Sequence, residues 1–417
     1  MPQNNYVIRV LNDWAELSST QWNALLQSRP DKQINPFMRH EYLAALHQSG
    51  SASAQTGWTL ALLTLWHEQD LAAACAVYRK THSYGEYVFD WAWAQAYQQH
   101  GLEYYPKALV ASPFTPVTGP RLLAIDDQAR DALVRELLQW CQQEGFSSLH
   151  LLFLEAPELS ACQQAGLMTR QTVQFHWHNQ QPDGQGPFDN FDTFLASLNQ
   201  DKRKKIRQER RKVAEAGVQF RWSQGRQIQA SDWDFFYRCY ERTYLEHGNA
   251  PYLSRDFFHR IASELPEHWL LFIAERSGRP IASSLIGLSG EVHPQGPARV
   301  AYGRYWGALE RVDCLHFEAC YYQPLQWCMD HGVQRFEGGA QGEHKMARAL
   351  MPTPTYSAHW LAHPAFAQAV DRFLKREDQG VEAYLGQLQS RTPFRQAWGR
   401  PRHPTEGRYL QAQWALL

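Results

Sequence analysis

Two stretches of the chain, LQWCQQEGFSSL (residues 138–149) and LQWCMDHGVQRF (residues 325–336), carry the same pattern. In both, a Leu-Gln-Trp-Cys run is followed by a glycine and then by apolar residues, and one spacing relates Trp140 to Trp327 and Gly145 to Gly332. The pattern predicts the end of an amphipathic helix, a glycine that stops it and a strand. A helix–glycine–strand unit in each half indicates an internal duplication.

The length of 417 residues suits two domains of ordinary size. Hydrophobic residues make up 44% of the chain, so each half can bury a sizeable core. A polar stretch rich in Gly, Pro and Gln, NQQPDGQGPFDN (residues 179–190), has the composition of a linker. We therefore predict an N-terminal domain over residues 1–180, a linker over 181–192 and a C-terminal domain over 193–417.

Each half also contains a hairpin pattern, over residues 58–78 in the first and 269–288 in the second. Helix and strand patterns alternate after each hairpin, which predicts the α/β class, with one mixed sheet flanked by helices in each half. Pro324 lies inside the helix expected over residues 315–330, so we expect a kink there or a later helix start.

Charge and cysteine content exclude several classes of protein. The net charge of −1 gives no overall attraction to nucleic acid or membrane, so an anion would have to bind a local cluster. The seven cysteines include no C-x-x-C pair and most lie among apolar neighbours, which predicts free thiols in a reducing compartment. The sequence shows no signal peptide pattern and no apolar run long enough to cross a bilayer, so we expect a cytoplasmic protein without integral membrane association.

Motifs for metal, nucleotide and hydrolase chemistry are missing from the sequence. His176 and His178 would point to the same side of a strand, but no Cys or acidic residue at a suitable spacing completes a metal site, so we predict no metal. The sequence also lacks G-x-S-x-G and the P-loop pattern. Hydrolase, P-loop and redox functions therefore lack the residues that they require.

Four long segments resemble the FemAB-like proteins, a family of tandem-GNAT predicted N-acyltransferases. They are YGEYVFDWAWAQAYQQHGLEYYPKALVASPFTPVTGPRLL (84–123), RKKIRQERRKVAEAGV (203–218), GRYWGALERVDCLHFEACYYQPLQW (303–327) and FEGGAQGEHKMARALMPTPTYSAHW (336–360). The likeness to the peptidoglycan-bridge aminoacyltransferases is weaker, resting on the basic helix and the strand-Gly-Gly turn. The resemblance implies two tandem GNAT-like (acyl-CoA N-acyltransferase) domains. It also implies transfer of an acyl or aminoacyl group, from a CoA or carrier thioester or from aminoacyl-tRNA, to a primary amine.

The segment FEGGAQGEHKMAR (residues 336–348) holds the densest group of polar residues. Acyl transfer to an amine needs a base for the amine proton and a donor for the oxyanion. We predict Glu337, Glu343 and His344 as the acid/base candidates, and Gln341 or the glycine amides as the oxyanion donor. The alternative is a surface turn whose charges are merely solvated.

Residues further along the chain are expected to complete the pocket. Arg304, Tyr305, His316 and Glu318 would form the opposite wall, and Tyr244 would line the acceptor site unless it is simply part of the core. GNAT proteins usually bind the CoA pyrophosphate with a glycine-rich turn after this strand, but here the turn reads LERVDC, without glycine. In the first half, Thr118, Gly119 and Arg121 could hold a phosphate instead, or form a plain turn between layers.

The run KRKKIRQERRK (residues 202–212) is strongly basic. It predicts a site for a polyanion, with Lys205 and Arg207 holding a phosphate-bearing acyl donor, although a solvated helix face is an equally good interpretation. Acyl-CoA or another thioester would be the co-substrate, and an acyl carrier protein or tRNA a macromolecular partner. The competing hypothesis is a catalytically inactive tandem GNAT protein that binds an anionic ligand or tRNA.

Overall fold

The computed structural model describes residues 6–28, 34–182, 184, 186–290, 299–340 and 342–395. Thirteen strands form one mixed sheet in the order β1-β2-β3-β4-β6-β13-β7-β12-β11-β10-β9-β8, with β5 paired to β3. The strands are β1 Val7–Leu11, β2 Trp58–His67, β3 Asp70–Lys80, β4 Lys107–Val110, β5 Leu123–Ala124, β6 Ser148–Leu154, β7 Met168–His178, β8 Val218–Gln224, β9 Trp269–Arg276, β10 Arg279–Leu288, β11 Val300–Ala308, β12 Arg335–Ala340 and β13 Met351–Leu361.

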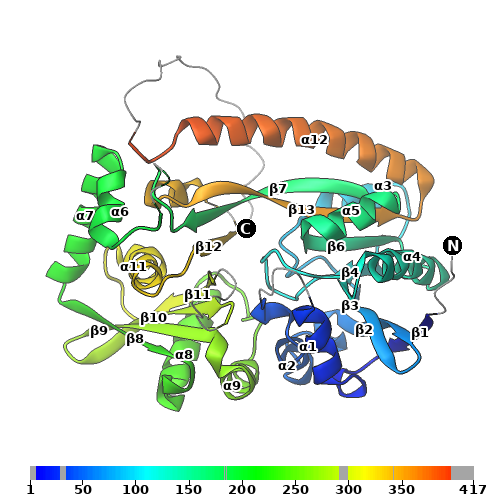
Figure 1. Cartoon of the computed structure of the whole chain (residues 1–417), viewed down its shortest axis with the longest axis horizontal. Helices are drawn as coiled ribbons and strands as arrows, with labels where there is room; N and C mark the ends of the chain where they lie inside the picture. The colour runs from blue at the N-terminus through cyan, green and yellow to red at the C-terminus, as the bar shows by residue number, and fades with distance from the viewer. Residues whose placement is uncertain are drawn as a thin grey trace.

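Helices cover both faces of this sheet (Figure 1). The α-helices are α1 Ser19–Gln27, α2 His40–Gln48, α3 Trp91–Gln99, α4 Asp127–Gln143, α5 Ala156–Gln164, α6 Phe191–Ser197, α7 Gln200–Glu215, α8 Ala230–Glu246, α9 Arg255–Glu264, α10 Leu315–Phe317, α11 Gln323–Asp330 and α12 Pro364–Ser390. A π-helix, Glu318–Tyr322, joins α10 to α11. The 3₁₀ helices are Trp14–Glu16, Pro36–Met38, Ala54–Thr56, Gly225–Gln227, Pro266–His268 and Glu343–Arg348.

The two repeated stretches occupy equivalent places. Helix α4 ends before Gly145, which has a φ of +69°, and α11 ends before Gly332, with a φ of +64°. In both cases the chain reverses and enters a strand that is parallel to an earlier strand of the same half: β6 lies parallel to β4, and β12 parallel to β11. Each half therefore contains one parallel crossover built on the same local pattern.

The two halves exchange strands at the centre of the sheet. Strand β13, from the second half of the chain, lies between β6 and β7, and β7 lies between β13 and β12. The β7–β13 ladder runs from His176 opposite Met351 to Met168 opposite His359, and α12 packs along both strands (Figure 1). One sheet thus continues through the whole molecule.

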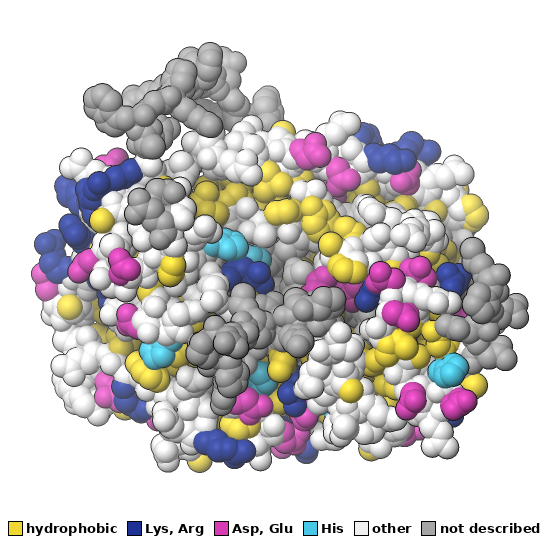
Figure 2. All heavy atoms as spheres, viewed as in Figure 1, with side chains coloured by type: hydrophobic (Ala, Val, Ile, Leu, Met, Phe, Trp, Pro, Cys, Tyr) yellow, Lys and Arg dark blue, Asp and Glu magenta, His cyan; other side chains and the backbone are white. Residues whose placement is uncertain are grey.

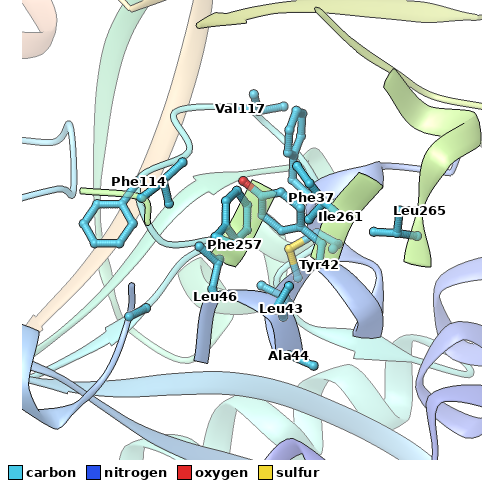
Figure 3. Close-up of a cluster of buried hydrophobic side chains, with 14 of the residues drawn as sticks. Phe37, Tyr42, Leu43, Ala44, Leu46, Phe114, Val117, Phe257, Ile261 and Leu265 are labelled. Carbon is cyan, nitrogen blue, oxygen red and sulfur yellow. The ribbon is translucent and has the colours of Figure 1, made fainter. Parts of the chain in front are cut away.

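A shared core also joins the halves beneath the sheet. The Phe37 ring lies 5.2 Å from Tyr302 and 6.2 Å from Trp269, and the Tyr42 ring lies 5.4 Å from Phe257. Figure 3 shows Phe37 and Tyr42 from the first half packed with Phe257 from α9. These side chains are fully buried, so the contact holds the two halves in a defined relation.

Candidate functional site

The parallel strands β11 and β12 part at a point lined by glycines. Their register pairs Val300–Tyr302 with residues 335–337 and goes no further. A Cβ on Gly303 would lie 2.9 Å from the Phe336 ring, and a Cβ on Gly338 would lie 2.4 Å from Leu350, so neither position accepts a side chain without movement. Gly339 follows with a φ of +76°. The local sequence thus places main chain, without side chains, where the two strands separate.

Glu337 is buried beside His176 at this parting. The two residues are 3% and 4% exposed, and 3.9 Å separates Glu337 Oε2 from His176 Nε2. Glu337 Oε1 accepts a hydrogen bond from Arg335 Nε at 3.0 Å, whereas Oε2 has no hydrogen-bond partner among the described residues. Burial lowers the pKa of His176, more than the neighbouring carboxylate raises it, so the imidazole is neutral near pH 7. The carboxylate therefore has an oxygen free to accept a proton.

Lys345 approaches the same parting from the helix Glu343–Arg348. It is 5% exposed, and its Nζ donates a hydrogen bond to Gly339 O at 3.1 Å. Burial lowers the pKa of Lys345 to about 8. Its charge contributes to the lowered pKa values of His176, His344 and His316. Lys345 is thus electrostatically coupled to groups on both sides of β12.

The predicted acid/base residues do not converge on one point. Phe336 packs in the core with the π-helix, so Glu337, the next residue of the strand, faces the other side of the sheet. His344 lies on the π-helix side, with its Nε2 3.5 Å from Tyr321 OH. Glu343 is exposed and accepts a hydrogen bond from Tyr384 OH of α12 at 2.8 Å. Gln341 lies outside the described residues.

Arg304, Tyr305 and Tyr244 belong to an aromatic cluster between the halves. Arg304 Nη2 donates to Phe114 O at 2.8 Å, and its guanidinium lies 5.0 Å from the Tyr305 ring. The ring of Tyr240 lies 4.8 Å from Tyr244 and 5.4 Å from Tyr305. Two bulky residues of the first half that border this cluster, Tyr87 and Phe114, have φ values of +62° and +57°. Such backbone strain is concentrated at functional sites in proteins.

His316 and Glu318 lie on the π-helix side, apart from the aromatic cluster. The His316 ring lies 5.4 Å from Trp306, and desolvation together with the His344, Arg348 and Lys345 charges lowers its pKa to about 4. Glu318 is buried, and its Oε1 accepts hydrogen bonds from Arg210 Nε at 3.1 Å and Gln323 Nε2 at 2.7 Å. Glu318 lines a separate cavity.

The turn after β11 does not fit a CoA pyrophosphate. The main-chain N–H groups of Phe317 and Glu318 donate to Cys314 O, at 3.0 and 3.1 Å, and Leu315 N–H donates to Val312 O. A pyrophosphate at this turn would need these N–H groups as donors, but they already donate to main-chain oxygens of the turn. The turn also carries Glu310 and Asp313. This turn therefore does not offer the phosphate site that GNAT proteins usually have after this strand.

The phosphate site predicted in the first half lies in the interior. Arg121 is 1% exposed, and its Nε donates to Leu152 O at 3.1 Å. Burial lowers the pKa of Arg121 to about 10. A Cβ on Gly119 would lie 2.1 Å from Asn35 Nδ2, and Thr118 O accepts from the same amide at 3.2 Å. This segment therefore makes packing contacts between layers.

Lys205 and Arg207 are exposed on α7, at one end of the sheet. Neither forms a hydrogen bond or ion pair with a described residue, and Figure 2 shows Lys and Arg side chains gathered over this end of the molecule. The structure does not bring them next to Glu337 or the aromatic cluster.

The sequence pattern does not reveal a buried polar network that the structure shows in the first half. Lys107 Nζ donates to Glu86 Oε2 at 2.8 Å and to Asp90 Oδ2, and Tyr104 OH donates to Asp90 Oδ2 at 2.6 Å. Tyr104 OH also lies 3.0 Å from His150 Nε2. Periodicity does not reveal the network because its members come from the two loops that flank α3 and from two strands.

Neither a metal cluster nor a membrane span is found in the described part of the chain. Its residues include no group of three or more His, Cys, Asp or Glu side chains able to hold a metal ion. None of its helices is long and apolar enough to cross a membrane.

The parallel crossovers and the central parting place the protein among α/β proteins with one mixed sheet. The FemAB-like family, described as peptidoglycan biosynthesis/recognition, matches residues 13–396, and the chain belongs to this family. The family assignment and the α/β prediction are therefore confirmed. No curated protein sequence gives a significant match.

Several solved structures resemble this chain at low sequence identity. The crystal structure of FemX aligns with a TM-score of 0.51 and 10% identity, over 87% of this chain and 100% of that chain. The C-terminal domain of a putative lysylphosphatidylglycerol synthetase from Agrobacterium fabrum aligns with a TM-score of 0.49 and 11% identity, over 86% and 96%. A tandem GNAT protein from the clavulanic acid biosynthesis pathway gives 0.44 and 10%, over 86% and 99%. At these identities the likeness to FemX supports the fold alone.

Proposed function

We propose that this protein is a transferase that moves an acyl or aminoacyl group from an ester or thioester to a primary amine. The observation that carries the proposal is the free Oε2 of the buried Glu337, beside neutral His176, at the glycine-lined parting of β11 and β12. Membership of the FemAB-like family supports it.

In the proposed reaction Glu337 is the base. Its Oε2 takes a proton from the acceptor ammonium, and the nitrogen lone pair then forms a C–N bond to the donor carbonyl carbon. The carbonyl oxygen becomes an oxyanion, and the Lys345 ammonium, hydrogen-bonded to Gly339 O in the resting protein, is the proposed donor that stabilises it. The oxyanion then reforms the carbonyl as the C–S or C–O bond of the donor breaks. The leaving group takes the second proton that the nitrogen loses, and Glu337 releases its proton to water.

The acceptor would enter on the side of the sheet that Glu337 faces. Arg304 Nε is buried there without a hydrogen-bond partner among the described residues, and Tyr305 and Tyr244 supply ring faces and hydroxyls. For the donor, the turn after β11 is excluded as a phosphate site, and Lys205 and Arg207 on exposed α7 are the proposed contacts. A carrier-bound thioester or an aminoacyl-tRNA, both large polyanions, would reach that helix more readily than a small thioester.

The test uses the full chain, incubated with acyl-CoAs, acylated carrier protein or charged tRNA and a pool of amines, with products followed by mass spectrometry. Once a product is found, Glu337→Gln should lower kcat about 100-fold or more, as expected for loss of a general base. Glu144→Gln, an exposed carboxylate at the end of α4, is the matched control and should change kcat less than about twofold.

Two outcomes would contradict the proposal. If Glu337→Gln retained full turnover, Glu337 would not be the base. If polyanions of every kind raised the unfolding temperature while no donor gave a product, the inactive binder, favoured by the exposed basic α7, would be the better interpretation.

A further inference from the structure

A cavity of about 350 Å³ lies on the outer part of the second half, between α7, β8 and the helices that follow β11. Its lining residues are Arg210, Arg211, Val213, Ala214, Val218, Phe220, Glu318 and Gln323. None of them belongs to the proposed transfer site around Glu337. The volume is at the lower end of the range of about 300–1,000 Å³ typical of small-molecule sites.

The charged residues that line this cavity favour a ligand that carries one negative charge. Arg210 Nε donates a hydrogen bond to Glu318 Oε1, and Arg210 Nη2 donates one to Gln326 Oε1, both at 3.1 Å. Among the described residues, Arg211 forms only a surface ion pair with Glu215, at 3.6 Å with both side chains 69% exposed. Surface pairs of this kind contribute little, so Arg211 can exchange its partner at small cost. Two guanidinium groups against the single lining carboxylate leave a net positive charge.

Half of the lining residues of the cavity are apolar. Val213 and Val218 are buried with 2% and 7% exposure, and the partly buried Phe220 packs against them. Ala214 adds a small side chain from the next position of α7. A hydrocarbon or aryl group placed here would be removed from water against these side chains.

We propose that this cavity is a binding site for a small carboxylate that carries an apolar body. The carboxylate lies toward Arg211 and Arg210, and the body lies against Val213, Val218 and Phe220. The site is independent of the proposed transferase activity. It shares helix α7 with the proposed donor contacts Lys205 and Arg207. The π-helix Glu318–Tyr322 also links it to the segment after β12, because its first residue lines the cavity and its Tyr321 contacts His344. Single-turn π-helices are frequent at functional sites.

The probe for the test is 4-phenylbutyrate, measured by isothermal titration calorimetry and saturation-transfer NMR on the full chain. Two matched compounds separate the contributions: 4-phenylbutanamide lacks the charge, and acetate lacks the body. The probe should bind one site, and each matched compound should bind about tenfold more weakly or worse. Equal binding of the amide would overturn the charge argument and with it the proposal.

Variants locate the site. Ala214→Leu fills the cavity without touching a charge and should abolish binding, whereas Gln208→Leu, an exposed position of the same helix outside the cavity, should not change it. Arg211→Gln should weaken binding several-fold. Glu337→Gln should leave it unchanged, so loss of binding in that variant would place the probe in the transfer site and overturn the proposal. Retained binding in a folded Ala214→Leu protein, checked by circular dichroism, would overturn it too.

Discussion

At the scale of single residues, Lys345 shows how the fold changes the chemistry of a side chain. In the sequence it is one of several charged residues after a glycine-rich turn. In the structure it is 5% exposed, and burial lowers its pKa to about 8, so part of the population is neutral at physiological pH. A buried amine of this kind can serve as a donor to a developing negative charge and still release a proton.

The lowered pKa of Lys345 predicts a dependence of stability on pH. An unfolded lysine titrates near 10.4, whereas this one titrates near 8 in the fold, so between these values the unfolded chain binds the extra proton. The free energy of unfolding should therefore increase with pH from about 8 to 10, relative to Lys345→Met, which lacks the group. Urea unfolding of both proteins at pH 7, 8, 9 and 10 measures the difference. A difference that stays constant across this series would contradict the lowered pKa.

The sequence draws attention to His176 but does not identify the residue with which it interacts. The pattern His-Trp-His predicts two histidines on one side of a strand, and the search for a third metal ligand then fails. The residue that His176 meets is Glu337, which is distant in the sequence and reaches it only because β7 pairs with β12. Glu337 itself could be chosen from its place before two glycines, but its partner could not.

At the scale of elements, the helix and strand patterns around the repeated stretch were sufficient to predict the crossovers. Pro324 was expected to bend or delay its helix, and it lies in the first turn of α11, directly after the π-helix. Strand β13 was missed because its sequence, MPTPTYSAHWL, contains two prolines, which argue against a central strand. Its position between β6 and β7 is set by tertiary contacts rather than by local propensity.

The register of β13 is held by a pair of buried histidines. His359 stands directly opposite His150 of β6, with 2.8 Å between their Nδ1 atoms, and Ser357 Oγ lies 2.8 Å from His359 Nε2. Burial lowers the pKa of His150 to about 3, so both rings are neutral and one donates to the other. Slipping the strand by one residue would leave buried imidazole groups unsatisfied.

Replacing both histidines of this pair should therefore cost less than the sum of the two single replacements. His359→Leu leaves the His150 imidazole without its partner and should lower the free energy of unfolding by about 1–3 kcal/mol. The double variant His150→Leu, His359→Leu should lose less than the sum of the two single variants. A double-mutant cycle by urea unfolding measures the coupling. Simple additivity would show that the pair does not act as a unit.

At the scale of the whole molecule, the exchange of β7 and β13 makes each half dependent on the other. The boundary at residues 181–192 remains a prediction about the chain, but the sheet does not divide there, since β7 of the first half pairs with β12 and β13 of the second. If the first half folded without β13, one edge of β6 and one edge of β7 would have no hydrogen-bonded neighbouring strand. Such edges, rich in buried apolar side chains, aggregate when uncovered.

The fragments 1–182 and 186–417 should therefore not fold separately. Each would lose the strand that covers its central edge, and the shared core of Phe37, Tyr42 and Phe257 would be divided between them. Expressed alone, each fragment should aggregate or melt without a cooperative transition. Expressed together, the two should form a complex with a single transition, because the exchanged strands restore one continuous sheet. The measurement is circular dichroism with temperature, combined with size-exclusion chromatography of the separate and joint fragments. If fragment 1–182 alone unfolded cooperatively as a monomer, the exchange of strands would not be what holds the halves together, and the duplicated unit would be an independent domain.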